Sequence, residues 1–373
     1  MKELREIIEK EIAKRGPIPF SRYMELCLYH PELGYYSRNA AQFGKAGDFF
    51  TSSDVHAVFG RLLARQFDEM WRVMGSPHRI AVKELGPGRG LFAQDVLDWS
   101  EKKFPEFFRA VRYLLVEQSP ALRDKISQTL EQRFASGKAT FATEEADQGA
   151  PVIVFANEFF DALPVEIVSS QGSLRIMAQN GRLGETWEKI SAEESEFLDR
   201  NSVRPEAGER IEVPLQAQAA MRSAAGIERG FVIIVDYGYT REEQLAGRHR
   251  GTLKSIRQHS VSGNPYEAPG EQDITADVNF TALAATAKQY GVHAEKLITQ
   301  SQFLMGIGEA NQFADAFEDA RLPQERAKIA LQLKHLVTPA GMGESFHVLV
   351  ASKGIDPNRV SDLSGLSFGR RYR

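Results

Sequence analysis

Residues 82–92 read Val-Lys-Glu-Leu-Gly-Pro-Gly-Arg-Gly-Leu-Phe, and this stretch decides the fold. An apolar run from Ile80 precedes it and a helical pattern follows it, which predicts a strand, a glycine-rich turn and a helix. Glycine lets a ligand approach the backbone at a point where a Cβ atom would clash. Because the first N–H groups of the helix point at the same place, we expect a polar ligand to bind at this turn.

The spacing of the glycines distinguishes two classes of ligand. A dinucleotide fingerprint has glycine at its first, third and sixth positions, whereas this turn has Gly86, Gly88 and Gly90, with Leu91 at the sixth position. Glu84 lies two residues before the first glycine, where it would repel a diphosphate and attract a ligand that carries an ammonium and a sulfonium. The pattern resembles the first motif of class I S-adenosylmethionine (SAM) methyltransferases; an ordinary strand-to-helix turn is the alternative.

The composition limits the other classes of function. The chain has 373 residues, enough for one large domain with insertions or for two domains. The formal charge of -4 gives no general attraction to nucleic acid or to an anionic membrane. A single cysteine, Cys27, excludes an internal disulfide, and no apolar stretch approaches the roughly 20 residues that span a bilayer.

Three further buried-type strands are expected, and each is followed by an acid. Residues 111–116 precede Glu117, residues 152–156 precede Asn157 and Glu158, and residues 231–235 precede Asp236. Parallel strands bind ligands beyond their carboxyl ends, so these acids should lie near the glycine turn. Glu117 could accept both hydroxyls of a ribose, a role that suits NAD as well as SAM.

The residues after the strand at 152–156 suggest a reactive site. Glu158, Phe159, Phe160 and Asp161 combine two acids with two rings, and many class I methyltransferases have a polar residue followed by aromatics at this sheet position. Glu158 could instead cap a turn while both phenylalanines pack in the core.

Outside these strands the chain predicts an N-terminal helical extension at 1–60 and a SAM methyltransferase domain at 61–373. Residues 43–52 combine glycine and aromatic residues, which indicates a loop that folds over the core or over a ligand. Two insertions are expected, a β meander with a helix at about 165–225 and a loop with helices at about 250–335. The end of the chain is predicted to be helical from about Gln312 to Leu336, followed by a strand that closes a late hairpin.

Six segments together resemble one family, the MidA-like SAM-dependent methyltransferases, whose mitochondrial member is a complex I assembly factor. They occur in order over nearly the whole chain, at 47–52, 84–90, 116–122, 156–164, 235–238 and 273–280. The resemblance implies an α/β class I SAM-dependent methyltransferase (Rossmann-like) fold with a mixed seven-stranded sheet. It also implies SAM as the cofactor and an arginine side chain of a protein as the acceptor.

Arginine is delocalised and stays protonated, so carboxylates must hold its guanidinium and localise its charge away from the attacking nitrogen. We predict that Glu158 is the main clamp, assisted by Asp161 or Asp48. Four rings, those of Phe49, Phe50, Phe159 and Phe160, are predicted to exclude water and to favour a cationic side chain. No metal is expected, because the chain has no zinc signature and no cysteine pair. The residues predicted to bind the cofactor are Glu84, Gly86, Pro87, Gly88, Gly90, Glu117, Gln118, Asn157, Glu158 and Thr51.

One departure from the family concerns the loop after His259. The family often has a second histidine and an acid there, whereas this chain has residues 260–264, Ser-Val-Ser-Gly-Asn, which puts a catalytic role of the loop in doubt. The alternatives to an active methyltransferase are a SAM-binding assembly factor with little turnover, an NAD-dependent oxidoreductase and a nucleic-acid methyltransferase. We expect a protein substrate, no nucleic-acid partner and no membrane insertion; a homodimer stays open. The absence of a mitochondrial presequence predicts a bacterial, cytoplasmic protein.

Overall fold

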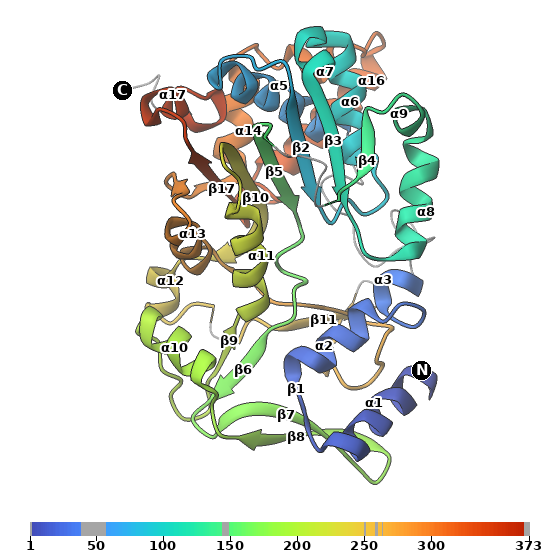
Figure 1. The fold of residues 1–373 in the computed structure, drawn as a ribbon, viewed down its shortest axis with the longest axis vertical. Helices are drawn as coiled ribbons and strands as arrows, with labels where there is room; N and C mark the ends of the chain where they lie inside the picture. Colours follow the sequence, from blue (N-terminus) through green and yellow to red (C-terminus); the bar gives the residue numbers. More distant parts are fainter. Residues whose placement is uncertain are drawn as a thin grey trace.

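A computed structural model describes residues 2–38, 57–143, 149–249, 251–257, 260–262 and 264–368. Its main sheet has the strand order β15-β17-β10-β5-β2-β3-β4, with β16 paired to β17 and β14 paired to β10 (Figure 1). In this sheet the neighbouring strands β4, β3, β2, β5 and β10 run parallel, and β17 is antiparallel to β10. The bounds are β2 (Ile80–Leu85), β3 (Val111–Val116), β4 (Ala139–Phe141), β5 (Val152–Asn157), β10 (Gly230–Tyr239), β14 (Val278–Asn279), β15 (His293–Ala294), β16 (Ile298–Thr299) and β17 (Phe346–Lys353).

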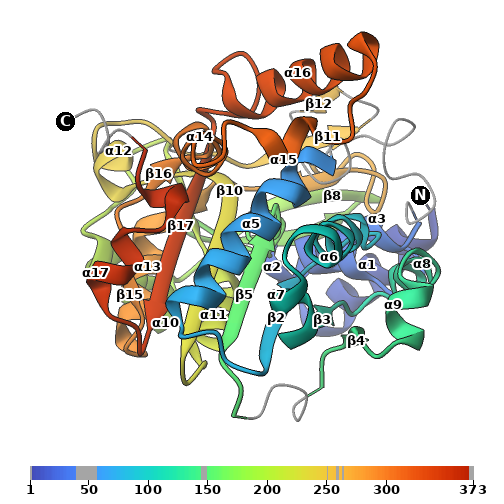
Figure 2. The ribbon, with the colours of Figure 1, turned by 90° about the horizontal axis from the view of Figure 1, so that it is seen from above.

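The central strands are apolar on both faces because helices cover both faces. Along β2, Ile80 and Val82 belong to the core under α5 and α6, and Ala81 belongs to the opposite core under α11 and α13. Figure 2 shows α5 lying over the strands of the sheet. The bounds are α5 (Ala57–Val73), α6 (Leu91–Lys103), α7 (Pro105–Ala110), α8 (Pro120–Thr129), α9 (Glu131–Ala135), α11 (Leu215–Ala225), α13 (Phe280–Gln289) and α17 (Pro357–Ser361).

The order of the strands places a reversal of the chain at β2. From β2 the chain moves outward to β3 and β4, and then returns to β5 on the other side of β2. In open α/β sheets ligands bind outside the carboxyl ends of the strands at such a reversal. The glycine turn that follows β2 therefore lies at the position where a ligand is expected.

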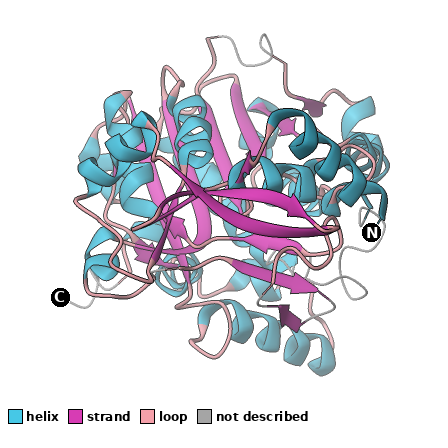
Figure 3. Cartoon of the chain, turned by 90° about the horizontal axis from the view of Figure 1, so that it is seen from below, coloured by secondary structure: helices cyan, strands magenta, loops and turns pink. Residues whose placement is uncertain are grey.

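The N-terminal helices pack on a second, antiparallel sheet that lies below the main sheet in Figure 1. Strand β1 (Ile18–Pro19) joins β7, so the sheet contains a strand from the start of the chain beside the meander. Figure 3 shows the β7–β8 hairpin from below. The bounds are α1 (Lys2–Arg15), α2 (Phe20–Tyr29), α3 (Tyr35–Arg38), β6 (Glu166–Ser169), β7 (Gly172–Gln179), β8 (Arg182–Glu188), α10 (Ala192–Asn201) and β9 (Arg210–Val213).

A third sheet has the order β12-β11-β13, with β11 (Lys254–Arg257), β12 (Ser260–Ser262) and β13 (Asp273–Thr275). Helix α12 (Arg241–Leu245) precedes it, and Thr240 caps that helix. The third sheet thus connects the end of β10 to the segment that enters α13.

Two details of the C-terminal part differ from the sequence prediction. The helix expected from Gln312 to Leu336 is interrupted, with α15 (Ala314–Phe317) and α16 (Pro323–Val337) separated by a break before Pro323, whose ring suits the first helical position. The closing strand β17 forms no tight hairpin, because α14 (Gln300–Glu309), α15 and α16 lie between it and its partner β16.

Candidate active site

The carboxyl ends of four parallel strands meet at one edge of the main sheet. Leu85 at the end of β2 is in register with Val116 on β3 and with Ala156 on β5. Asn157 on β5 is in register with Val235 on β10. The residues that follow these positions are therefore neighbours, although up to about 150 positions of sequence separate them.

The glycine turn has the backbone that the motif requires. Gly86, Gly88 and Gly90 have φ angles of +65°, +54° and +79°, a region that favours glycine. A Cβ atom on Gly86 would lie 2.7 Å from the ring of Phe159, so a side chain there would displace the ring. A Cβ atom on Gly88 would meet no heavy atom within 4 Å, which leaves space beside its backbone. The turn therefore has free space for a ligand at Gly88, whereas the ring of Phe159 occupies the space at Gly86.

The side chain of Glu84 is buried beneath this turn. Its side chain is only 4% exposed, and one carboxylate oxygen accepts a hydrogen bond of 2.9 Å from the hydroxyl of Tyr113. Burial raises the pKa of Glu84 to about 8, against an ordinary value of 4.5. A buried carboxyl of this kind gains from a cationic partner, which fits a ligand with an ammonium or a sulfonium group.

Glu117 is held by the start of the next helix. Its Oε1 atom accepts a hydrogen bond of 2.7 Å from the backbone N–H of Ser119, and Ser119 caps α8. Burial raises the pKa of Glu117, and hydrogen bonds from the backbone of Ser119 and Gln118 oppose that rise. The backbone thus fixes the orientation of the carboxylate that we predict to bind a ribose.

The segment after β5 has an unusual backbone. Glu158 has a φ angle of +50°, which a residue with a Cβ atom adopts at the expense of strain. Its backbone N–H continues the pairing with β10 by donating to Val235 at 2.9 Å, and the side-chain amide of Asn157 donates to Glu158 Oε1 at 3.1 Å. The strain and the amide contact together direct the Glu158 side chain, the predicted clamp.

Asp161 lies at the end of the same segment and is nearly buried, with 6% of its surface exposed. The hydroxyl of Tyr237 donates a hydrogen bond of 2.5 Å to its Oδ2 atom. Burial raises the pKa of Asp161 to about 6, and the bond from Tyr237 opposes part of the rise. The second sequence-predicted acid is therefore fixed by a tyrosine from β10.

Asp236 was expected near the glycine turn but was given no role, and two tyrosines of the N-terminal extension were missed as site residues. Asp236 is fully buried and contacts the segment after β5. Tyr29 donates to the carbonyl of Ala162 at 2.9 Å, and Tyr36 donates to Asp273 at 3.0 Å. An acid directly after a buried strand was the available signal for Asp236; the tyrosines had none, because only folding brings α2 and α3 to this edge.

Several predicted residues lie outside the described part of the chain. They are Asp48, Phe49, Phe50, Thr51 and His259. Within the described residues, no group of three or more His, Cys, Asp and Glu side chains is arranged to hold a metal ion. Among the described helices, none combines the length and the apolar character of a bilayer-spanning segment.

Four features define the chain as a class I SAM-dependent methyltransferase. The parallel sheet reverses at β2, and the antiparallel strand β17 lies next to the parallel strand β10. A glycine turn follows β2, and an acid follows β3. The sequence model of Methyltransf_28, a family of S-adenosyl-L-methionine-dependent methyltransferases, matches residues 62–298. The chain belongs to this family. The match decides against the NAD-dependent alternative.

Relatives and solved structures agree with this assignment. The chain is 31% identical to the mitochondrial protein arginine methyltransferase NDUFAF7 homolog of Drosophila melanogaster, over 93% of this chain and 84% of that protein. It is 28% identical to the mitochondrial protein arginine methyltransferase NDUFAF7 of Danio rerio, over 92% and 86%. A COG1565 superfamily protein of Burkholderia thailandensis bound to S-adenosyl-homocysteine superposes with a TM-score of 0.83 at 28% identity, over 98% of this chain and 95% of that one.

The residues at the sheet edge fit SAM. The open space at Gly88 admits a ligand to the backbone, and the buried Glu84 carboxyl suits a cation. Glu117 lies one strand further along the edge, where a ribose would follow. The contacts of every residue predicted to bind the cofactor stay predictions.

Proposed function

We propose that this methyltransferase modifies an arginine side chain of a protein. The observation that carries the proposal is the pair of acids, Glu158 and Asp161, on one strained segment beside the glycine turn. The names of the relatives from Drosophila melanogaster and Danio rerio, both protein arginine methyltransferases, support the same acceptor.

When bound, SAM supplies a methyl group on a sulfonium, which a nitrogen lone pair can attack. The protein must then position an arginine side chain and keep its charge off the attacking nitrogen. A carboxylate and a guanidinium form paired hydrogen bonds with fixed geometry, so Glu158 would hold the two nitrogens that do not react. The carboxylate of Asp161 would add negative charge on the same side.

The rings after β5 have separate roles. Phe159 lies against Gly86 and would exclude water from the cofactor, while Phe160 is buried in the core beside α11 and α13. The face of Phe159 would also favour a cationic side chain. Phe160 thus anchors the segment, and Phe159 borders the site.

The test is methyl transfer from labelled SAM by the purified protein into host-cell lysate, followed by identification of the modified peptide. We expect a methylated arginine, and a subunit of respiratory complex I is the first acceptor to examine because the family resemblance suggests it. Label on lysine, on nucleic acid or on a small molecule would overturn the proposal. SAM binding without any transfer would favour an assembly factor with little turnover.

A further inference from the structure

The end of β10 holds the segment after β5 through a single carboxylate. Asp236 Oδ2 accepts hydrogen bonds from three successive backbone N–H groups, those of Phe159 at 3.2 Å, Phe160 at 3.0 Å and Asp161 at 3.3 Å. Its Oδ1 atom accepts from the N–H of Tyr237 at 3.0 Å. The side chain has no exposed surface.

This contact explains how the segment keeps its shape. Residues 159–161 leave the strand pairing, so their N–H groups need acceptors other than a neighbouring strand. Glu158, one residue earlier, has the strained φ angle of +50°. Three hydrogen bonds directly after the strained residue hold it in a conformation that it would otherwise leave.

Tyr237 fixes the far end of the same segment. Its hydroxyl is bonded to Asp161 Oδ2, and its ring packs edge-on against Phe346 with the centroids 5.6 Å apart. The ammonium of Lys254 lies 5.1 Å from the centre of the ring. Two consecutive residues of β10 therefore hold the segment, one through its backbone and one through the Asp161 side chain.

We propose that Asp236 is a positioning residue for methyl transfer, which sets the backbone of residues 158–161 so that Glu158 and Asp161 meet the acceptor side chain. The inference rests on the proposed function, because Asp236 would act through Glu158 and Asp161 and would contact neither the acceptor nor SAM. It assigns to Asp236 an effect on turnover that exceeds its effect on stability.

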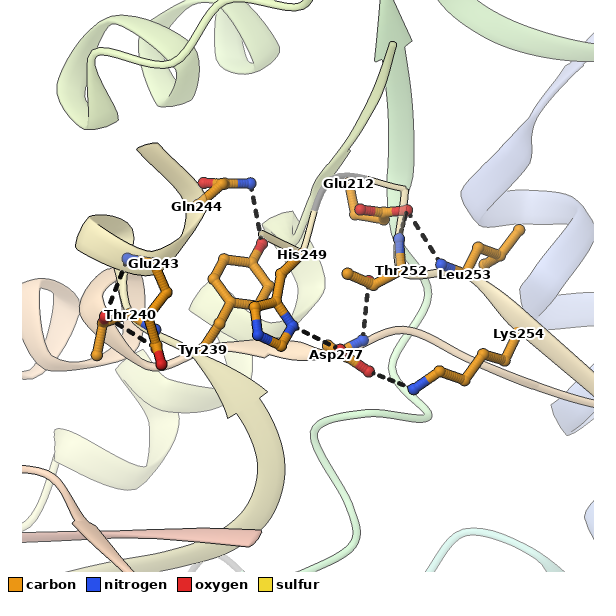
Figure 4. A network of polar contacts seen from close by, with 10 residues as sticks. All are labelled: Glu212, Tyr239, Thr240, Glu243, Gln244, His249, Thr252, Leu253, Lys254 and Asp277. Carbon is orange, nitrogen blue, oxygen red and sulfur yellow. Dashed lines mark hydrogen bonds and ion pairs between the residues drawn. The ribbon is translucent and has the colours of Figure 1, made fainter. Parts of the chain in front are cut away.

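A second buried carboxylate offers a matched control. Glu212 on β9 is 3% exposed, and its Oε1 atom accepts hydrogen bonds from the N–H groups of Thr252 at 2.8 Å and Leu253 at 3.2 Å (Figure 4). It makes the same kind of backbone contact, but with Thr252 and Leu253 in place of residues 159–161, although Glu212 and Phe160 line one cavity. Glu212→Gln should therefore report the structural consequence alone.

The experiment compares Asp236→Asn and Glu212→Gln with the unaltered protein in three measurements: SAM binding by calorimetry, unfolding in urea, and initial rates of methyl transfer into lysate. Asp236→Asn has one acceptor oxygen for the four N–H groups that Asp236 binds with two, so it weakens this contact. It should transfer methyl about 100-fold more slowly, the effect of a small misplacement of catalytic groups, with SAM affinity unchanged. Hydrogen exchange at residues 159–161 should accelerate in Asp236→Asn and not in Glu212→Gln. Glu212→Gln should keep its transfer rate.

The outcomes distinguish a failure of the positioning role from a failure of the proposed function. Full transfer by Asp236→Asn, or unchanged exchange at residues 159–161, overturns the positioning role alone. A change in transfer that follows the change in stability in the same way in both variants also overturns it. If the unaltered protein binds SAM but methylates nothing, the proposed function fails and this inference fails with it. Should Asp236→Asn not fold, Tyr237→Phe tests the second anchor with the backbone contacts intact, and full transfer by that variant at every pH counts against the arrangement.

Discussion

Replacing Glu84 with glutamine should make the protein more stable without cofactor and weaken its affinity for SAM. Glu84 is 4% exposed and shares a hydrogen bond with Tyr113, which glutamine can keep through its own oxygen. The substitution therefore removes a buried carboxyl that must either keep its proton or carry a buried charge, and it changes little else. Loss of that charge is favourable in the free protein and unfavourable when a cation is bound.

The size of the effect follows from the pKa of Glu84, which burial raises from 4.5 to about 8. The folded protein keeps a proton that the unfolded chain releases, so this carboxyl lowers stability as pH rises from about 4.5 to about 8. At about 1.4 kcal/mol for each pH unit, the contribution reaches about 3 kcal/mol at pH 7. The glutamine variant lacks this loss, so it should match the unaltered protein near pH 4.5 and exceed its stability near pH 8.

Urea unfolding at several pH values, without cofactor, measures the difference in free energy, and calorimetry measures the affinity for SAM. A charge-assisted hydrogen bond contributes about 1.5–3 kcal/mol, so Glu84→Gln should bind SAM about 10- to 100-fold more weakly at pH 8. The control is Glu212→Gln, because burial raises the pKa of Glu212 to about 7 away from the glycine turn. As pH rises, that variant should also become more stable than the unaltered protein, while its affinity for SAM stays the same.

Two results would refute the reasoning. A Glu84→Gln variant that is less stable than the unaltered protein at pH 8 would show that the carboxyl is ionised and satisfied without a ligand. Unchanged affinity for SAM at pH 8 would show that no cationic group of the cofactor interacts with Glu84.

Three further predictions concern the acceptor and the turn. Glu158→Gln should reduce methyl transfer about 100-fold while calorimetry shows normal SAM binding, and near-normal turnover would remove Glu158 from the mechanism. Gly88→Val should abolish SAM binding, since the valine side chain fills the space beside the turn. Because the φ angle of +54° adds about 1–2 kcal/mol of strain, circular dichroism must show that the variant is folded. Retained SAM binding would contradict the cofactor placement. Methyl transfer should rise with pH through about 6 as Asp161 ionises, and Tyr237→Phe should move that rise to higher pH because the lost hydroxyl favours the carboxylate. The groups that interact with Asp161 and influence this profile are Tyr237, Asp236, Asp277, Tyr29 and Tyr36. An unshifted profile in Tyr237→Phe would argue against Asp161 as the titrating group.

Much of the sheet could be predicted from local patterns. The strand at 111–116 is as predicted, because an apolar run is a local signal, and Ser119 followed by Pro120 is a local signal for the helix that Ser119 caps. Asp277 and Asn279 both precede the helical run of α13 and could each cap it; Asn279 is the cap, and Asp277 pairs with His249 and Lys254 (Figure 4). Helix α10 was missed, although Ser191 and Glu194 form a capping box.

The sequence by itself determined the glycine turn, the buried strands and the acids that follow them, because each depends on neighbouring residues and on a period that the chain displays. Only the tertiary structure decided what those acids do. Asp236 reaches N–H groups 75 to 77 positions away, and β1 pairs with β7 more than 150 positions later. The burial that raises the pKa of Glu84 comes from a sheet packed on both faces. Such contacts depend on which strand ends meet, and no local pattern encodes that.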